Sequence, residues 1–299
     1  MKLSIIIVNW NTGPLLRKCL DALPYAALKV VDGAATCVPF KYEVFVVDNA
    51  SRDNSLTHAR ESYQPFTHIS LPKNVGFARA NNIALRQARG DILLLLNPDT
   101  EPRPGSFSAL MNFFATHPKA GIVGGKLLNT DGSLQRSVRR FPTPIVLALL
   151  LTRLARLQTS FPAIRRYEMA DFPYGRDTKV DQVMGACFAI RRGVVDVIGL
   201  LDEGYWIWFE EVDYCRRAKL AGWETWFTPS AEVVHDRATS FAQVSPLWRA
   251  WQFSRSALRY TWKHQGWWAA IGLSTLVPVS LGTALIASLS RKPPSVRRV

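Results

Sequence analysis

The chain has 299 residues, 48% of them hydrophobic and 20% charged, so it is long enough to bury a large core in one catalytic-sized domain with an appendage. Its four cysteines, Cys19, Cys37, Cys187 and Cys215, are too scattered for a zinc site or a disulfide framework, and the apolar start is too short for a signal peptide. We therefore expect a protein of the reducing cytoplasm, with a formal net charge of +14 to which residues 237–299 contribute nine Lys or Arg and no acid.

Residues 1 to about 125 alternate between strand patterns and helix patterns. We expect strands at 3–8, 42–47, 67–71 and 92–96, and helices at 13–23, 53–61 and 77–88. Continuous apolar strands separated by helices are typical of a mostly parallel sheet that is covered on both faces. The sequence therefore predicts an α/β fold.

Polar residues directly follow three of these strands. Asn9 and Asn11 follow the first, Asp48 follows the strand at 42–47, and Asn97 and Asp99 follow the strand at 92–96. Open α/β sheets bind ligands at the carboxyl ends of their strands, so these side chains outline one site. Each pattern alone also fits a helix cap or a turn, but three in succession favour a site.

The segment "KNVGFARANN", residues 73–82, leads into one of the predicted helices. Asn74 and Gly76 lie at its start, where backbone amides are suited to phosphate and a glycine allows a ligand to approach the chain closely. A single glycine is weak support for a site. The segment supports a ligand site only in combination with the polar residues at the strand ends.

Residues 205–213 join an aromatic run to three carboxylates, Glu210, Glu211 and Asp213. Acidic residues in the first turn of a helix complement its dipole, and Arg216 and Arg217 lie close enough along the helix to neutralise them. By itself this pattern favours a structural role, and only the neighbouring motifs favour a chemical one.

The end of the chain has the composition of a membrane-binding segment. In residues 245–264, tryptophans recur on one helical face beside Arg and Lys, and residues 265–290 carry no charge. The uncharged run is long enough to span a bilayer, but Gly272, Pro278 and Gly282 interrupt it. Basic residues also flank it on both sides (Arg259, Lys263, Arg291, Lys292, Arg297 and Arg298). Membrane attachment is therefore predicted, either as a span or as a re-entrant or interfacial hairpin.

Residues 143–158 form a second apolar stretch, which fits either a membrane contact or an ordinary buried helix. No internal repeat and no nucleic-acid-binding module is recognisable, so nucleic acid is not an expected partner.

Seven motifs in order resemble one known family: "SIIIVNWN", "VVDNASRDNS", "NVGFARANN", "LLLLNPDT", "GACFAIRR", "LDEGYWIWFEEVDYCRRAKLAGW" and "AEVVHDRATS". The chain resembles glycosyltransferase family 2, the inverting nucleotide-sugar transferases, and is most similar to the bacterial rhamnosyltransferase branch. The resemblance spans roughly residues 3–241. It implies a GT-A catalytic domain at 1–241, with a mostly parallel central sheet and helices on both faces, and a membrane-associated helical tail at 242–299.

The resemblance also implies a donor site and a metal site. Residues lining the donor pocket would be Asn9, Asn11, Asp48, Asn74, Gly76, Asn97, Gly185 and Ala186, with Asp48 holding the base or ribose. Asp99 would bind Mg²⁺ or Mn²⁺ on the donor's diphosphate, with His235 completing the site. Asn97 stands where many relatives carry the first aspartate of a D-x-D motif, which leaves one carboxylate. A lone histidine after apolar residues is also a common structural feature.

In similar enzymes the motif at "FEEVDYC" supplies the general base. The match falls on Glu211, where the family usually has aspartate, and Glu210 and Asp213 are the alternatives. Trp206 and Trp208 would stack on acceptor sugar rings, although core packing explains aromatic residues equally well.

We therefore expect an inverting glycosyltransferase on the cytoplasmic face of the cell membrane. It would use a dTDP- or UDP-activated sugar, rhamnose or another hexose, and a glycolipid or growing surface polysaccharide as acceptor. Two alternatives remain: a same-fold transferase with a soluble or protein acceptor, and an inactive sugar-nucleotide-binding scaffold subunit.

Overall fold

The computed structural model describes residues 1–299 except 32–33, 37–39, 63–64, 157–160, 237–242 and 290–299. Cys37 and the basic residues expected after the last apolar run lie outside the described residues. The chain forms two compact units. Unit 1 comprises Met1–Phe141 and Glu168–Ser240, and unit 2 comprises Pro142–Tyr167 and Phe241–Val299.

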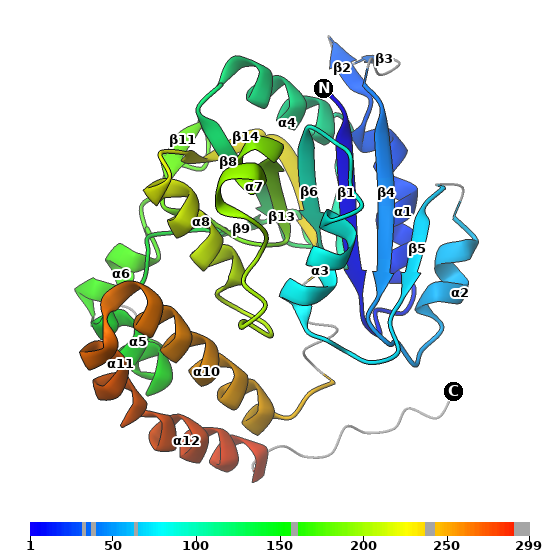
Figure 1. Ribbon diagram of the computed structural model, residues 1–299. Coiled ribbons are helices and arrows are strands. Elements are labelled where there is room, and N and C mark those ends of the chain that lie inside the picture. The colour runs from blue at the N-terminus through cyan, green and yellow to red at the C-terminus, as the bar shows by residue number, and fades with distance from the viewer. Residues whose placement is uncertain (32–33, 37–39, 63–64, 157–160, 237–242, 290–299) are drawn as a thin grey trace. The chain divides into compact units, whose positions relative to one another are not determined.

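Unit 1 is built on a mixed sheet that has ten strands in the described residues (Figure 1). Its main path runs β11-β14-β8-β13-β6-β1-β4-β5, with β7 paired to β14 and β9 paired to β8. These strands are β1 (Leu3–Asn9), β4 (Tyr42–Asp48), β5 (Thr67–Ser70), β6 (Ile92–Leu96), β7 (Thr100–Pro102), β8 (Ala120–Leu128), β9 (Leu134–Gln135), β11 (Thr178–Val180), β13 (Cys187–Arg191) and β14 (Glu224–His235). Two small hairpins complete the unit: β2 (Lys29–Val31) with β3 (Ala34–Thr36), and β10 (Val138–Arg139) with β12 (Gln182–Val183).

Helices cover both faces of this sheet because its central strands are apolar on both sides. Alternate residues of β1 enter different cores: Ile5 packs on one face and Ile6 on the other. The first core includes α1 (Leu15–Ala26) and α4 (Ser106–Thr116). The second includes α3 (Phe77–Leu85), α7 (Arg192–Ile198) and α8 (Glu210–Leu220). A short helix, α2 (Ser55–Arg60), packs beside α1.

The predicted α/β fold class is confirmed. The strands β1, β4, β5 and β6 pair in parallel, as the uninterrupted apolar runs indicate. Strand β13 is inserted antiparallel between β6 and β8, and β14 then pairs parallel with β8. The carboxyl ends of β1, β4 and β6 therefore meet at one edge, and β13 begins at that same edge.

Unit 2 is helical. It contains α5 (Pro144–Leu151), the 3₁₀ turn η1 (Leu154–Arg156), α6 (Pro162–Tyr167), α10 (Pro246–Gln265), α11 (Trp267–Ser274) and α12 (Val277–Leu289). Helix α10 packs on α12, α11 and α5, and Gln265 donates a hydrogen bond to the carbonyl of Pro142 at 2.5 Å. The internal segment that contains the apolar stretch at 143–158 thus belongs to the same unit as the C-terminal helices.

The uncharged run predicted from the sequence is divided between α11 and α12. Within the part of the chain that the structure describes, Trp267–Leu289 is one segment with the length and composition needed to cross a membrane, and little of it is buried. The break lies at Thr275 and Leu276, between the two helices.

Candidate active site

At the carboxyl edge of the sheet, Asn9 and Asp48 face each other across neighbouring strands. The Asn9 amide donates to Asp48 Oδ1 at 3.1 Å, to Ser51 Oγ at 2.9 Å and to Ser55 Oγ at 2.8 Å. Its own Oδ1 accepts from the Thr12 hydroxyl at 2.6 Å. Both Asn9 and Asp48 are buried, so the two strand ends are held in one polar network.

A second network connects the end of β4 with the segment before α3. The Asn49 amide donates to Asn74 Oδ1 at 3.0 Å, which also accepts from the backbone N–H of Gly76 at 3.0 Å. Gly76 has φ = 86°, and a Cβ there would lie 2.5 Å from the carbonyl oxygen of Trp206. That carbonyl accepts from the Phe77 N–H at 2.7 Å. The glycine is therefore required for this loop to approach the 205–209 aromatic run.

Four non-glycine residues at this edge have positive φ. They are Asn11 (51°), Ala50 (62°), Trp208 (64°) and Phe209 (70°). Asn11 is held by hydrogen bonds from its N–H to Ser51 Oγ at 3.1 Å and from the Arg52 N–H to its Oδ1 at 2.7 Å. Backbone strain of this kind costs of order 1–3 kcal/mol per residue and clusters at functional sites. These positive-φ residues lie in the same loops as the sequence motifs.

The structure brings Asp99 and His235 together from positions 136 residues apart in the sequence. Strand β14 pairs antiparallel with β7, and His235 lies opposite Thr100. His235 Nε2 is 3.4 Å from Asp99 Oδ1, and the Asp236 N–H donates to the Asp99 carbonyl at 2.9 Å. Both side chains are largely buried, at 8% and 12% exposure.

Helix α8 begins with two adjacent glutamates whose side chains enter the interior. Glu210 is 5% exposed, and among the described residues Oε2 of each glutamate has no hydrogen-bond partner. Burial raises the pKa of Glu210 well above its ordinary value, and the charge of Glu211 adds to this. Burial also raises the pKa of Glu211, against backbone hydrogen bonds and the positive charge of Arg139. A carboxylate whose pKa is raised is a stronger base than one in water.

Two contacts connect Glu211 with the other predicted residues. A Cβ on Gly185 would lie 3.9 Å from both Cβ and Cγ of Glu211, in ordinary van der Waals contact. The next residue, Ala186, accepts a hydrogen bond from the Asn97 N–H at 3.0 Å. The end of β6, the start of β13 and the start of α8 are therefore neighbours.

Asp213 forms an ion pair within α8. Its side chain is fully buried and pairs with Arg217 at 2.8 Å, and Arg217 also donates to the carbonyls of Ile198 and Leu200. These contacts join α8 to the loop after α7. Arg191 and Arg192 likewise donate to backbone carbonyls, at Ala120 and Gly90 among others, so these two guanidinium groups hold the chain together.

The structure also identifies two residues of the site that the sequence analysis does not single out. Gln135 of β9 is 1% exposed and contacts His235, with 2.7 Å between its Oε1 and the imidazole Nδ1. Ser51 contacts three of the strand-end residues, Asn9, Asn11 and Asp48. The serine was within reach of sequence reasoning, because it follows the strand end directly. Gln135 was not, because it lies 100 residues from its partner.

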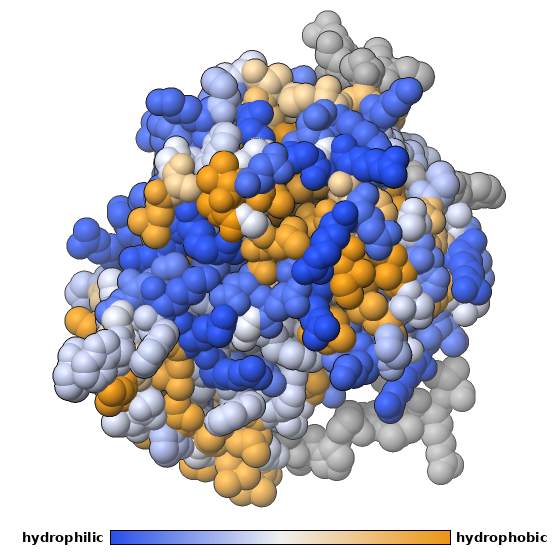
Figure 2. Space-filling model, in the orientation of Figure 1, coloured by the Kyte–Doolittle hydropathy of each residue, from blue (hydrophilic) through white to orange (hydrophobic). Residues whose placement is uncertain are grey.

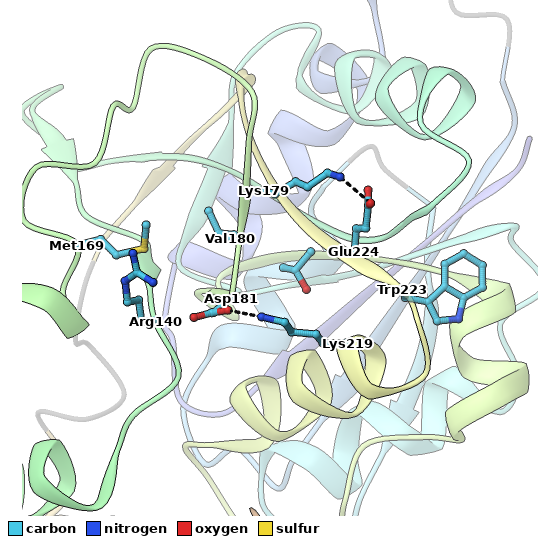
Figure 3. Close-up of a pocket in the computed structure, with 9 residues that line it drawn as sticks. Arg140, Met169, Lys179, Val180, Asp181, Lys219, Trp223 and Glu224 are labelled. Atoms are coloured by element: carbon cyan, nitrogen blue, oxygen red, sulfur yellow. Dashed lines mark hydrogen bonds and ion pairs between the residues drawn. The ribbon is translucent and has the colours of Figure 1, made fainter.

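A pocket of about 300 Å³ lies at the other end of these elements (Figure 3). It is lined at the start of β14 by Glu224 and at the end of α8 by Lys219, whereas the site lies at the end of β14 and the start of α8. Its lysines are matched by acids, with Lys179 2.7 Å from Glu224 and Lys219 2.8 Å from Asp181.

A sheet of this order, with its polar strand ends gathered at one edge, is the architecture of the GT-A class of sugar transferases. The family model described as glycosyl transferase family 2 matches residues 4–199, and the chain belongs to that family. It is therefore a glycosyltransferase.

Curated relatives support the predicted rhamnosyltransferase branch. The N-acetylglucosaminyl-diphospho-decaprenol L-rhamnosyltransferase of Mycobacterium tuberculosis is 27% identical over 285 residues, which cover 90% of this chain and 87% of the relative. The rhamnosyltransferase WbbL of Escherichia coli K12 is 26% identical over 170 residues, covering 54% and 60% of the two chains.

Among solved structures, a mannosyltransferase from Pyrobaculum calidifontis in complex with GDP-Man and Mn²⁺ superimposes with a TM-score of 0.56. It is 18% identical, and the match covers 98% of this chain and 76% of that one. The predicted fold is confirmed by this likeness, and a divalent cation is found in proteins of this fold.

Proposed function

We propose that this protein is an inverting glycosyltransferase that transfers rhamnose or another hexose from a nucleoside-diphosphate donor to a hydroxyl of a lipid-linked or surface-polysaccharide acceptor. The observation that carries the proposal is the gathering at one sheet edge of the Asp99–His235 pair and the strand-end network around Asp48. The partly buried Glu211 adjoins the same edge through Gly185 and Ala186. Relatives named as rhamnosyltransferases support the choice of sugar, and one of them is named for an acceptor with a diphospho-lipid.

The donor's nucleoside would bind at the ends of β1 and β4, where Asn9, Asn11 and Asp48 lie. The segment before α3, with Asn74 and Gly76, would line the same pocket, and glycine is required at position 76 because a Cβ there would meet Trp206. The donor sugar would lie near Asn97, Gly185 and Ala186, between the metal pair and the base.

Asp99 and His235 fit a divalent cation. No group of three or more His, Cys, Asp or Glu side chains in the described residues could hold a metal, so the protein would supply two ligands here. Mg²⁺ commonly takes one or two protein ligands and completes its shell with substrate phosphates and water. When bound, Mg²⁺ or Mn²⁺ stabilises the negative charge that grows on the leaving diphosphate.

Glu211 would act as the general base. Its carboxylate takes the proton of the acceptor hydroxyl, while that oxygen attacks the anomeric carbon on the face opposite the diphosphate. The bond from that carbon to the diphosphate oxygen breaks in the same step, so the configuration at the anomeric carbon inverts. Trp206 and Trp208 adjoin this site and would orient the acceptor's sugar ring. We assign Asp213 to the structure of α8, since its carboxylate pairs with Arg217.

The protein would act at the cytoplasmic face of the membrane, to which unit 2 attaches it. Helix α10 buries Ser254, Thr261, Ala257 and Tyr260 and exposes Trp251 (50%) and Trp262 (64%), so its largest apolar side chains lie at the surface. Ser254 contacts Ser280 of α12 at 3.5 Å between the two hydroxyl oxygens. Helices in lipid pack through small residues, and tryptophans gather at the membrane interface. Figure 2 shows apolar side chains at the surface of α12.

The test is release of nucleoside diphosphate by the detergent-purified protein, given a panel of dTDP-, UDP- and GDP-sugars with bacterial glycolipid extract. We expect one donor to be consumed only with lipid and with Mg²⁺ or Mn²⁺, and Asp99→Ala to remove the cation-dependent turnover. A product of retained anomeric configuration, determined by nuclear magnetic resonance, would contradict the single displacement. Turnover on a soluble acceptor without lipid would contradict the acceptor, and a donor that binds without being consumed would favour the scaffold alternative.

A further inference from the structure

Gln135 occupies a buried position beside the proposed metal pair. It lies in the two-residue strand β9, which pairs antiparallel with the end of β8, with Leu127 opposite Gln135. Its side chain is 1% exposed, and its carboxamide contacts both the backbone and the imidazole of His235. A buried amide must satisfy its hydrogen-bonding groups inside the protein, so its orientation is informative.

The partners of Gln135 determine which way its amide faces. Nε2 donates to the carbonyl oxygen of His235 at 3.2 Å and to Asn129 Oδ1 at 2.9 Å. A backbone carbonyl can only accept, so the amide nitrogen must face it. Gln135 Oε1 therefore faces His235 Nδ1, 2.7 Å away, and an oxygen in that position accepts the Nδ1–H.

This hydrogen bond selects one tautomer of His235. When a neutral imidazole carries its proton on Nδ1, Nε2 holds a lone pair. Nε2 of His235 lies 3.4 Å from Asp99 Oδ1, so the ring nitrogen and the carboxylate oxygen face the same space. An imidazole nitrogen with a lone pair and a carboxylate oxygen held side by side in this way are donor atoms that a divalent cation would take.

We propose that Gln135 is a positioning residue for the metal site, which accepts a hydrogen bond from His235 Nδ1 and so presents the Nε2 lone pair to a divalent cation shared with Asp99. This inference rests on the proposed function, in which Asp99 and His235 hold the cation. Outer partners of this kind orient a ligating histidine and change metal affinity by about 10–100-fold when they are lost.

Mn²⁺ binding to the detergent-purified full chain, measured by electron paramagnetic resonance with and without UDP or dTDP, tests the proposal without relying on turnover. We expect Gln135→Met to raise the Kd for Mn²⁺ about 10–100-fold. Gln135→Glu keeps an oxygen for Nδ1–H but loses the Nε2 donor, so it should weaken Mn²⁺ binding less than Gln135→Met does. If Gln135→Met does not fold, Gln135→Asn withdraws the same oxygen by one methylene and should weaken Mn²⁺ binding similarly.

Gln182→Met is the matched control. Gln182 is another buried glutamine of unit 1, 5% exposed, and donates to the carbonyl of Arg140 away from the metal pair. It should lose thermal stability as Gln135→Met does, yet keep the Kd for Mn²⁺. An unchanged Kd in Gln135→Met, or an equal rise in Gln182→Met, would overturn the positioning role.

Asp99→Asn separates this inference from the function on which it rests. If Asp99→Asn weakens Mn²⁺ binding but Gln135→Met does not, only the role of Gln135 is wrong. If Asp99→Asn binds Mn²⁺ as tightly as the original protein, the cation assignment itself is wrong, and the role of Gln135 fails with it.

Discussion

At the scale of single residues, Glu210 and Glu211 occupy adjacent positions in different surroundings. Glu210 is 5% exposed, whereas Glu211 is only partly buried and lies beside Gly185 and the charge of Arg139. Trp208 and Phe209 precede them with φ of 64° and 70°, a backbone conformation that directs the helix start into the interior. Burial thus raises the pKa of both carboxyl groups, that of Glu210 the more strongly.

We predict that Glu211→Gln retains donor binding and lowers kcat by roughly 10²-fold or more, because the amide cannot accept the hydroxyl proton. Donor Kd by calorimetry and initial rates of nucleoside diphosphate release measure the two effects separately. Glu224→Gln, at the remote start of β14, is the control and should keep full activity. Full activity in Glu211→Gln would remove this residue from the mechanism.

We predict that Glu210→Gln raises Tm at about pH 8 and changes it little at about pH 4. The pKa of Glu210 is raised in the folded protein by burial first and by Glu211 second, so the folded state holds this proton more tightly than the unfolded state. The stability that the protonated carboxyl contributes is fully present below the unfolded pKa and is lost as pH rises through the folded pKa. Gln cannot ionise, so thermal unfolding scans of the variant should lack this loss. An equal change at both pH values would show that ionisation is not the cause.

At the scale of elements, the loop before α3 and the 205–209 run are joined through Gly76. Its positive φ and its contact with the Trp206 carbonyl are separate constraints, and the chain offers a control that separates them. Gly222 has φ = 87°, almost equal to the 86° of Gly76, but a Cβ there would meet nothing within 4 Å.

Gly222→Ala should therefore lower the unfolding free energy only by the cost of placing alanine at positive φ, of order 1–2 kcal/mol. Gly76→Ala should lower it more and should also raise the Kd for the donor, since the Trp206 loop must move. Chemical denaturation and donor binding measure both quantities. Equal effects in the two variants would show that the close approach to Trp206 is unimportant.

Elements were predictable where the pattern is local. The strands β1, β4, β5 and β6 and the helices between them lie where apolar runs and turn residues indicate. The antiparallel insertion of β13 was not predictable, because an apolar strand looks the same in either direction. The pairing of β14 with β7, which brings His235 to Asp99, depends in the same way on which distant strand lies beside it.

At the scale of the whole molecule, the chain combines an α/β unit with a helical unit that exposes large apolar side chains. Unit 1 buries Leu, Ile and Val, whereas α10 of unit 2 buries serine and threonine beside Ala257 and Tyr260 and exposes two tryptophans. Residues 142–167 belong to unit 2. The membrane-associated segment that we predict at 242–299 would therefore include this internal segment as well.

We predict that replacing Trp251 and Trp262 together with Gln lowers binding to vesicles that contain anionic lipid, while thermal stability in detergent stays unchanged. Both indoles are exposed, at 50% and 64%, so their loss removes little packing within unit 2. Flotation with vesicles of anionic or neutral lipid measures the binding, and the matched variant Tyr25→Gln removes an exposed aromatic residue of unit 1. Undiminished flotation of the double variant would show that this face does not meet the membrane.

The sequence by itself determined the family, the α/β class, the strand ends that carry the polar residues and the apolar tail, because each depends on residues close together in the chain. The tertiary structure decided which of the candidates become neighbours. It places Asp99 beside His235, pairs Asp213 with Arg217 and places Gln135 in contact with the imidazole of His235. These contacts join residues between 4 and 136 positions apart, and most buried polar groups take whichever partner the fold brings beside them, however distant it is in the sequence.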